Sequence, residues 1–580
     1  MVKGIPSKRY QILLRITAVA LVLGSTLINI KNIFTSCQVD AEYQVAMAYR
    51  ILRGDRMFSQ MWEAHQTSAF FLAFFEWFFL KMTGSTTGIV VYANTVGVLC
   101  KTAVAFCVYG TFRKFADKRS AFAVLLLTLN AYPKEIVLPD FANQQIWFGL
   151  LLMCCLIWYF EHQKIKWLVL GAVCLCLQVL SYPSCVLVWI MCVVLIWMYS
   201  SKKGRDICIF TGVCGIGAAS YLGYFMRGNP RQFMQYIYYI WSGDEAHAVG
   251  LGGRLVALWH DMPMLVSDLK YILIVAVCAV LAAWICRIID RRREWTGRKM
   301  FYMVFCWFMA LYILGYLIYL PAEKALTKQH FYILYVFVSA AGWKGIKNLD
   351  QREKRIFMIG QFVGFGGFVA TLLLSDMGVF SAFAYMIPST CAAIVSVSKL
   401  REEEETDRAG WKCYLPAALL CAVLIFRNGI YLNGWTAGPD NFYEDSIFSV
   451  DWTAKYGPLK GIISRAGTYV ADVSYQEWQN LIQDGDRVMV IGHPTITATV
   501  YLNKDVEICT DSVISTPTYS ERLFTYWEEN PDKNPNVVVL KCYEGSAMTG
   551  EYNSVIQWLM EEVPVKRIVD GVFWRYYFLE

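Results

Sequence analysis

Several side chains that could carry acid–base chemistry lie in one short stretch of the sequence, from Ser36 to Ser68. The stretch reads SCQVDAEYQVAMAYRILRGDRMFSQMWEAHQTS and lies between two strongly apolar segments. Asp40 and Glu42 follow the first apolar segment, and His65 comes shortly before the second. A carboxylate can accept the proton of a hydroxyl nucleophile, so these two acids are candidates for a general base. We expect the stretch to lie at a membrane surface, because it is polar and its neighbours are not.

A further acid, Asp140, lies in the sequence LPDFANQQIWFG, between two other apolar segments. The alternation of apolar segments across a membrane places Asp140 on the same side as Asp40. Asp140 or Asn143 could instead cap the helix that follows, because both residue types accept hydrogen bonds from the free N–H groups at a helix start. Capping is also an alternative for Asp40. Asp140 is therefore expected to cap this helix, to belong to the site, or to do both.

Cations that could bind a phosphate group occur in two loops on the same predicted side. The sequence PAEKALTKQHFYIL carries Lys328, His330 and Tyr332, and a longer loop carries Arg254. Lys and Arg donate charge-assisted hydrogen bonds to phosphate oxygens, which suits a phosphodiester at a membrane surface. Lys and Tyr also anchor helices at the membrane interface without any ligand. Both interpretations stay open, and the arginines of the longer loop, Arg227, Arg231 and Arg254, are rival phosphate ligands.

The composition indicates a membrane protein, since 57% of the 580 residues are hydrophobic and 16% are aromatic. The long apolar runs predict about thirteen membrane-spanning helices, one of them at 120–138, and hence a polytopic α-helical membrane protein. The net charge of +7 comes mostly from loops between spans, which indicates membrane orientation rather than nucleic-acid binding. The sequence has no Walker A motif and no Rossmann fingerprint, which argues against a nucleotide-driven pump.

The distribution of Lys and Arg predicts the orientation and the domains. Basic residues before the first span, 12–34, place the N-terminus in the cytoplasm and the next loop outside. This first external loop, 36–87, should contain interfacial helices. Its apolar segment at 69–82 could be a span or an interfacial helix, but the basic loop at 113–119 is cytoplasmic only if 69–82 stays on the outer surface. Residues 1–432 would form the transmembrane domain. After it, the strand patterns RVMVIG, VEIC and NVVVLKCY predict a small α/β domain at 433–580, outside the membrane.

The motifs around Asp40 resemble those of a known enzyme family. They are an acid just after the first span, x-E-Y, a short amphipathic helix, R-G-D, W-E-x-H, and an apolar stretch that ends in Gly84. This pattern resembles the first external loop of the GT-C glycosyltransferases, in the branch of the protein O-mannosyltransferases and the lipid A aminoarabinose transferase. The chain reads D-A-E where many relatives have adjacent D-E. It reads HQT, starting at His65, where they have Lys-Pro-Pro or a similar sequence.

The resemblance implies a membrane glycosyltransferase that moves a sugar from a polyprenyl-phosphate donor to an acceptor hydroxyl, with inversion, outside the cell membrane. It implies that Asp40 is the catalytic carboxylate of the first loop, and it makes Glu42 and Asp140 further candidates. Residues of three loops would bind the donor phosphate or the substrate: His65, Arg254, Lys328, His330 and Tyr332. The acceptor could be a glycan, a lipid or a protein. The resemblance requires no cofactor and leaves the use of a divalent metal open.

Two other functions stay open from the sequence: a transporter or flippase of lipid-linked sugars, and a polysaccharide ligase or polymerase. A transporter should carry ionisable residues inside its spans, near the middle of the membrane. Most of the predicted spans are nearly free of charge in their centres, which favours a glycosyltransferase with an external site. The absence of any N-x-S/T sequon agrees with a bacterial source. The oxidation state of Cys509 and Cys542 is not predicted.

Overall fold

The three-dimensional structure is a computed structural model of the whole chain. It describes residues 8–37, 39–63, 65–133, 136–226, 230–234, 269–291, 297–319, 332–374, 379–400, 425, 429, 431–434, 443–450, 452–464, 467–491, 500–502, 505–511, 520–541, 558, 561 and 563–580. Some sequence predictions fall outside these residues, including those for Arg254, Lys328, His330 and Cys542.

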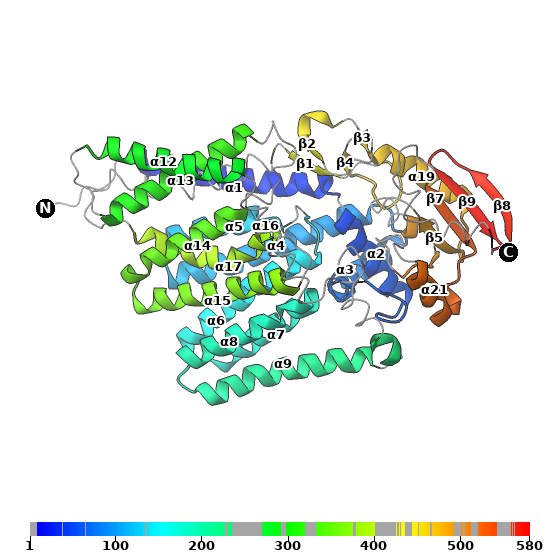
Figure 1. Cartoon of the computed structure of the whole chain (residues 1–580), viewed down its shortest axis with the longest axis horizontal. Coiled ribbons are helices and arrows are strands. Elements are labelled where there is room, and N and C mark those ends of the chain that lie inside the picture. Colours follow the sequence, from blue (N-terminus) through cyan, green and yellow to red (C-terminus); the bar gives the residue numbers. More distant parts are fainter. Residues whose placement is uncertain are drawn as a thin grey trace.

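Helices dominate the described chain up to residue 400 (Figure 1). Their bounds are α1 Lys8–Thr35, α2 Val39–Arg53, η1 Gln66–Ser68, α3 Ala69–Thr83, α4 Ile89–Phe115, α5 Lys118–Asn130, α6 Phe141–His162, α7 Ile165–Ser181, η3 Pro183–Cys185, α8 Val186–Tyr199, α9 Lys203–Phe225, α12 Leu269–Ile289, α13 Gly297–Tyr319, α14 Ile333–Gly345, η5 Ile346–Asn348, α15 Gln351–Leu374, α16 Val379–Ala382, η6 Phe383–Met386 and α17 Ile387–Ser398. The predicted helical architecture is confirmed.

Six of the described helices are long and apolar enough to cross a membrane. They are Arg15–Thr35, Ile89–Phe115, Phe141–His162, Lys203–Phe225, Gly297–Leu314 and Gln351–Leu373. Four shorter apolar helices, at 165–181, 183–199, 274–289 and 383–398, accompany them. These lengths and compositions support the multi-pass membrane protein that the sequence predicts, whereas the number of thirteen spans stays a prediction.

The predicted span at 120–138 is wrong in its second half, because α5 ends at Asn130. The next ten residues, AYPKEIVLPD, contain two prolines, and the residue before a proline avoids helical backbone angles. Part of this segment lies directly on α4 at Gly97, where a Cβ atom would overlap the carbonyl oxygen of Val137. The absence of a side chain at Gly97 therefore lets the segment that leads to Asp140 pack against α4.

Residues 36–87, which we call the first external loop after their predicted orientation, contain two helices, α2 and α3. The first, α2, ends at Arg53, and Gly54 follows with φ of 101°, a left-handed conformation that glycine adopts without strain. The second, α3, has 15 residues and is too short to span a bilayer of about 30 Å. One face of α3 is exposed and carries Phe74, Trp77 and Phe78. These are the residue types expected at a membrane interface.

The C-terminal region, by which we mean the described residues from 431 to 580, is mainly strands with two helices, α19 Gly467–Leu481 and α21 Ser520–Glu529. Its strands are β1 Tyr431–Gly434, β2 Tyr443–Ser446, β3 Trp452–Thr453, β4 Ile463–Ser464, β5 Arg487–Ile491, β6 Glu507–Ile508, β7 Val537–Lys541, β8 Val565–Asp570 and β9 Trp574–Leu579, and it also holds η8 Ile447–Ser449 and η9 Pro531–Lys533. The main sheet has the order β6-β5-β7-β9-β8, with β6, β5 and β7 parallel and β9 antiparallel to its neighbours. The sheet lies at the end of the molecule that α2 and α21 also occupy (Figure 1).

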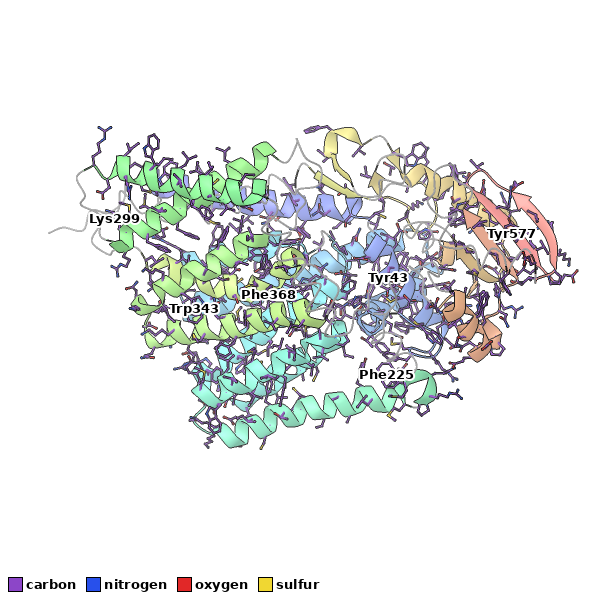
Figure 2. All side chains as sticks on the ribbon, viewed as in Figure 1. Tyr43, Phe225, Lys299, Trp343, Phe368 and Tyr577 are labelled. Carbon is purple, nitrogen blue, oxygen red and sulfur yellow. The ribbon has the colours of Figure 1, made fainter. Side chains whose placement is uncertain are left out.

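Two hydrophobic clusters hold most of the buried side chains. The first joins the membrane helices from α4 to α17. The second joins α2, the first external loop and the C-terminal region: Ala41, Val45 and Trp62 belong to the same cluster as Tyr526 and Trp574. Figure 2 labels Tyr43 on α2, between the membrane helices and the sheet that carries Tyr577. The first external loop therefore shares its core with the C-terminal region.

Candidate functional site

Ser68 forms hydrogen bonds with one glutamine of α2 and one of α6. The hydroxyl of Ser68 lies 3.0 Å from Oε1 of Gln44 on α2, and its carbonyl oxygen accepts a hydrogen bond of 2.9 Å from Nε2 of Gln144 on α6. Asp40 and Asp140 precede these glutamines by four residues each. Four residues are about one helical turn, roughly 6 Å along the axis, and place both side chains on the same helix face. Ser68 thus links the two helices whose starts carry the predicted acids Asp40 and Asp140.

Asp140 is the N-cap of α6. Its Oδ1 accepts a hydrogen bond of 2.9 Å from the backbone N–H of Asn143, and its side chain is fully buried. The amide of Asn143 donates in turn to the carbonyl oxygens of Ile136 and Leu138, at 3.0 and 2.9 Å. The capping role considered for Asp140 is therefore confirmed. The contacts with the preceding backbone fix the segment that carries it.

Glu42 is buried, unlike the half-buried Asp40 two residues before it. Burial raises the pKa of Glu42 from 4.5 to about 8, and a hydrogen bond from Sγ of Cys37 to its Oε1, at 3.0 Å, only partly offsets this. The other oxygen, Oε2, is buried without a hydrogen-bond partner among the described residues. At neutral pH Glu42 is therefore mostly protonated, whereas a general base must be ionised to accept a proton.

The raised pKa of Glu42 makes a prediction about stability. The folded protein keeps a proton that the unfolded chain releases above its pKa near 4.5, so the stability contribution of Glu42 falls between about pH 4.5 and about pH 8 and then stays constant. Because Gln cannot ionise, the Glu42→Gln variant should melt at a higher temperature than the wild type, by a margin that grows from pH 5 to pH 8. Melting curves of the purified protein measure this margin. An unchanged margin between pH 5 and pH 8 would contradict the prediction. The control is Glu528→Gln, which makes the same change at an exposed position.

His65 lies in a stack of aromatic rings. Its ring lies parallel to that of Phe141, with 3.8 Å between centroids and 14° between planes, and 5.1 Å from the ring of Tyr182. Phe141 directly follows Asp140, and Thr67 donates a hydrogen bond to the carbonyl oxygen of Leu180 at 2.5 Å. The structure therefore places the predicted residue His65 beside Asp140, at the ends of α6 and α7.

Tyr332 is buried at the start of α14 and donates a hydrogen bond of 2.7 Å to the carbonyl oxygen of Tyr132. Tyr132 belongs to the segment between α5 and α6, so Tyr332 supports the backbone that leads to Asp140. Its hydroxyl is engaged with this backbone. Within the described part of the chain, no group of three or more His, Cys, Asp and Glu side chains has the arrangement of a metal site.

Sequence reasoning did not single out Gln44, Ser68 and Gln144, which connect the two helix starts. A signal for the glutamines was present, because DAEYQ and DFANQ share the pattern D-x-x-x-Q. Gln144 also accepts a hydrogen bond of 3.0 Å from Ser181, the last residue of α7. Nε2 of Gln44 is buried without a hydrogen-bond partner among the described residues. Buried polar atoms are nearly always paired, so Gln44 is a candidate to bind a polar ligand.

Comparison with known proteins gives matches among solved structures. No family model and no curated protein matches the chain. The crystal structure of ArnT from Cupriavidus metallidurans bound to undecaprenyl phosphate matches with a TM-score of 0.42 and 10% identity, over 96% of this chain and 97% of that chain. ArnT from the same organism in the apo state matches with a TM-score of 0.39 and 10% identity, over 98% of each chain.

ArnT is the lipid A aminoarabinose transferase, a member of the branch that the sequence motifs resemble. A match at this TM-score gives no residue a role, and the roles proposed below rest on the contacts within this chain.

Proposed function

We propose that the protein is a membrane glycosyltransferase that moves a sugar from a polyprenyl-phosphate donor to an acceptor hydroxyl, with inversion. The observation that carries the proposal is the link through Ser68 between Gln44 on α2 and Gln144 on α6, because these two helices carry Asp40 and Asp140 at their starts and α6 is long and apolar enough to cross a membrane. A lipid-linked donor has its tail in the bilayer and its sugar at the surface. A site for transfer must therefore lie at such helix ends.

The residues of the site fit one chemical step. Asp40 accepts the proton of the acceptor hydroxyl while the hydroxyl oxygen forms a bond to the anomeric carbon. The bond from that carbon to the phosphate oxygen breaks on the opposite face, as in inverting glycoside chemistry. The polyprenyl phosphate leaves as a stable anion and needs no general acid. Glu42 is neutral at pH 7 and can donate a hydrogen bond that orients the acceptor.

The donor phosphate requires cations. We propose Lys328 and Arg254 for this role, with His330, Tyr332 and His65 near the substrate; the first three of these five lie outside the described residues. A phosphodiester charge at a membrane surface is matched by Lys or Arg through charge-assisted hydrogen bonds. The His65 ring packs against the buried rings of Phe141, the residue after Asp140, and Tyr182.

An assay with purified protein tests the proposal. The protein is incubated with a polyprenyl-phosphate sugar carrying a labelled sugar, together with glycan, lipid or peptide acceptors that bear free hydroxyls. Release of the polyprenyl phosphate and labelling of an acceptor, with inverted configuration at the anomeric carbon, are the expected results. Retention of configuration would reject the mechanism, and no transfer to any acceptor class would reject the proposed activity.

We further propose that the N-terminus is cytoplasmic and that residues 433–580 form an α/β domain on the outer face of the cell membrane. The basic loops predict this orientation. In a cysteine-depleted background, a membrane-impermeant maleimide added to intact cells should label Lys566→Cys and spare Lys166→Cys. Both positions are exposed, so accessibility within the fold does not bias the result. Labelling only at position 166 would show that the orientation is the reverse of the one proposed.

One observation favours a second function, transport of a lipid-linked sugar. Lys101 is buried within the candidate span Ile89–Phe115, and its Nζ has no hydrogen-bond partner among the described residues; it lies 3.0 Å from the ring centroid of Tyr132. An ionisable residue inside a span often marks a transport path. Proteoliposomes separate the two functions, because a transporter moves the labelled donor between leaflets without any acceptor.

A further inference from the structure

A cluster of buried charges joins the first external loop to the C-terminal region. On the loop side, Arg50 pairs with Asp55 at 2.7 Å and with Glu63 at 3.2 Å. On the other side, Lys533 pairs with Asp55 at 2.5 Å and also contacts Glu507. The side chains of Arg50, Glu63 and Lys533 are fully buried, and that of Asp55 nearly so. Asp55 thus lies between two cations that come from opposite ends of the chain.

We propose that Lys533 is a positioning residue: through Asp55 and Arg50 it holds the first external loop in the arrangement that transfer requires. The inference rests on the proposed function and assigns a task to the C-terminal region. Lys533 cannot touch the reacting atoms itself, because its ammonium group is fully enclosed by carboxylates of the cluster and their surroundings.

Neutral hydrogen bonds hold the same part of the loop. The hydroxyl of Tyr526 donates to the carbonyl oxygen of Gln60 at 2.8 Å, and Nδ2 of Asn530 donates to that of Ser59 at 3.0 Å. The backbone N–H of Trp62 donates to the carbonyl oxygen of Asp511 at 2.8 Å. Each loop residue here is bound by a residue of the C-terminal region. The loop conformation between Gly54 and Glu63 therefore depends on the last quarter of the chain.

Contacts continue from the cluster to the candidate site along two routes. Arg50 belongs to α2, the helix whose first turn carries Asp40, so a shift of Arg50 is transmitted along a rigid element. Glu63 offers its carbonyl oxygen to Nε2 of Gln66 at 2.9 Å, and His65 lies between these two residues. Both Asp40 and His65 are thus connected to Lys533 through the cluster.

The charges of the buried cluster explain how Lys533 can control the geometry of the first external loop. The cluster contains two cations and three carboxylates, and buried ion pairs add little net stability because their desolvation offsets their attraction. Their geometry, however, is strict, since each displaced charge would be left unpaired in a buried environment. A loss of Lys533 leaves Asp55 paired with Arg50 alone, so the loop can shift while the chain remains folded. Misplacement of a catalytic group by about 1 Å can cost up to roughly 100-fold in rate.

The test compares Lys533→Met with Lys566→Met, which removes the same charge from an exposed position of the C-terminal region. In the transfer assay, kcat of Lys533→Met should be at least about tenfold lower than that of Lys566→Met, with KM for the donor within about twofold. The double variant Lys533→Met/Asp55→Asn should be no slower than Lys533→Met, because the two residues act through each other. Equal kcat values for the two single lysine variants would overturn the proposal.

Hydrogen exchange gives a second measurement that needs no activity. Peptides covering residues 55–68 should exchange faster in Lys533→Met than in Lys566→Met and in the wild type. If the wild type transfers no sugar, the proposed function fails, and the exchange data still decide whether Lys533 holds the loop. If Lys533→Met does not fold, the double variant Lys533→Met/Asp55→Asn, which removes one charge of each sign from the cluster, supplies both measurements. Equal exchange in the compared proteins would overturn the positioning role.

Discussion

Replacing Asp40 with Asn should lower kcat for sugar transfer by about 100-fold or more, the usual contribution of a general base. Asn has the size of Asp but cannot take the proton of the acceptor hydroxyl. Asp40 lies in the first turn of α2 and is half-buried, so its charge also interacts with the helix dipole. That interaction is worth about 0.3–1 kcal/mol. Donor binding and the melting temperature should therefore stay close to the wild type.

Asp117 provides the matched control for this experiment. It caps α5 by accepting hydrogen bonds from the backbone N–H groups of Arg119 and Ser120, both at 2.9 Å. Asp117→Asn thus makes the same chemical change at a helix start that has no place in the candidate site, and kcat should be unaffected. Near-normal turnover in Asp40→Asn would limit Asp40 to a role at the helix start. The base would then have to be sought at Glu42 or Asp140.

Replacing Arg50 with Met should lower the free energy of unfolding by about 3–5 kcal/mol, the cost of leaving buried charges without their partner. Arg50 is the contact that neutralises Glu63, and it also donates to the carbonyl oxygen of Gln60 at 2.5 Å. Met fills much of the space but offers no hydrogen bond. Denaturant unfolding followed by tryptophan fluorescence measures the loss, since Trp62 packs edge-on against Tyr526 with 5.4 Å between centroids.

Arg53, one helical turn further along α2, tests whether burial is the cause. It pairs with Asp505, but 37% of its side chain and 58% of that of Asp505 are exposed. Exposed ion pairs contribute about 0–1 kcal/mol. Arg53→Met should therefore remain within about 1 kcal/mol of the wild type. Equal losses of unfolding free energy in Arg50→Met and Arg53→Met would show that the buried cluster adds no more stability than a surface ion pair.

The sequence predicted those parts of the fold that local patterns specify. The apolar run at 12–34 lies within α1, and the pattern RVMVIG predicted β5. The exposed strand β8 was missed, because VKRIVD lacks the alternation of a half-buried strand. The end of the predicted span at 120–138 was also wrong, since hydropathy continues through AYPKEIVLP although the two prolines interrupt the helix.

The candidate site was predicted less completely than the helices. Asp40, Glu42, Asp140 and His65 were recognised from residue type and context. The buried state of Glu42, which makes it neutral, depends on packing that no spacing in the sequence specifies. The pairing of Lys533 with Asp55 joins residues 478 positions apart. Only the three-dimensional fold brings such charges together, so sequence patterns alone cannot identify Lys533.

The shared core of the first external loop and the C-terminal region has a consequence for biosynthesis. Lys533 is added to the chain 478 residues after Asp55. At about 5–20 residues per second, roughly 25 to 100 seconds pass between the two events. During this interval α2 lacks the part of its hydrophobic core that the C-terminal region supplies. The site can therefore be assembled only after the C-terminal region has been synthesised. A chain that stops before residue 520 would insert its membrane helices but could not complete the site.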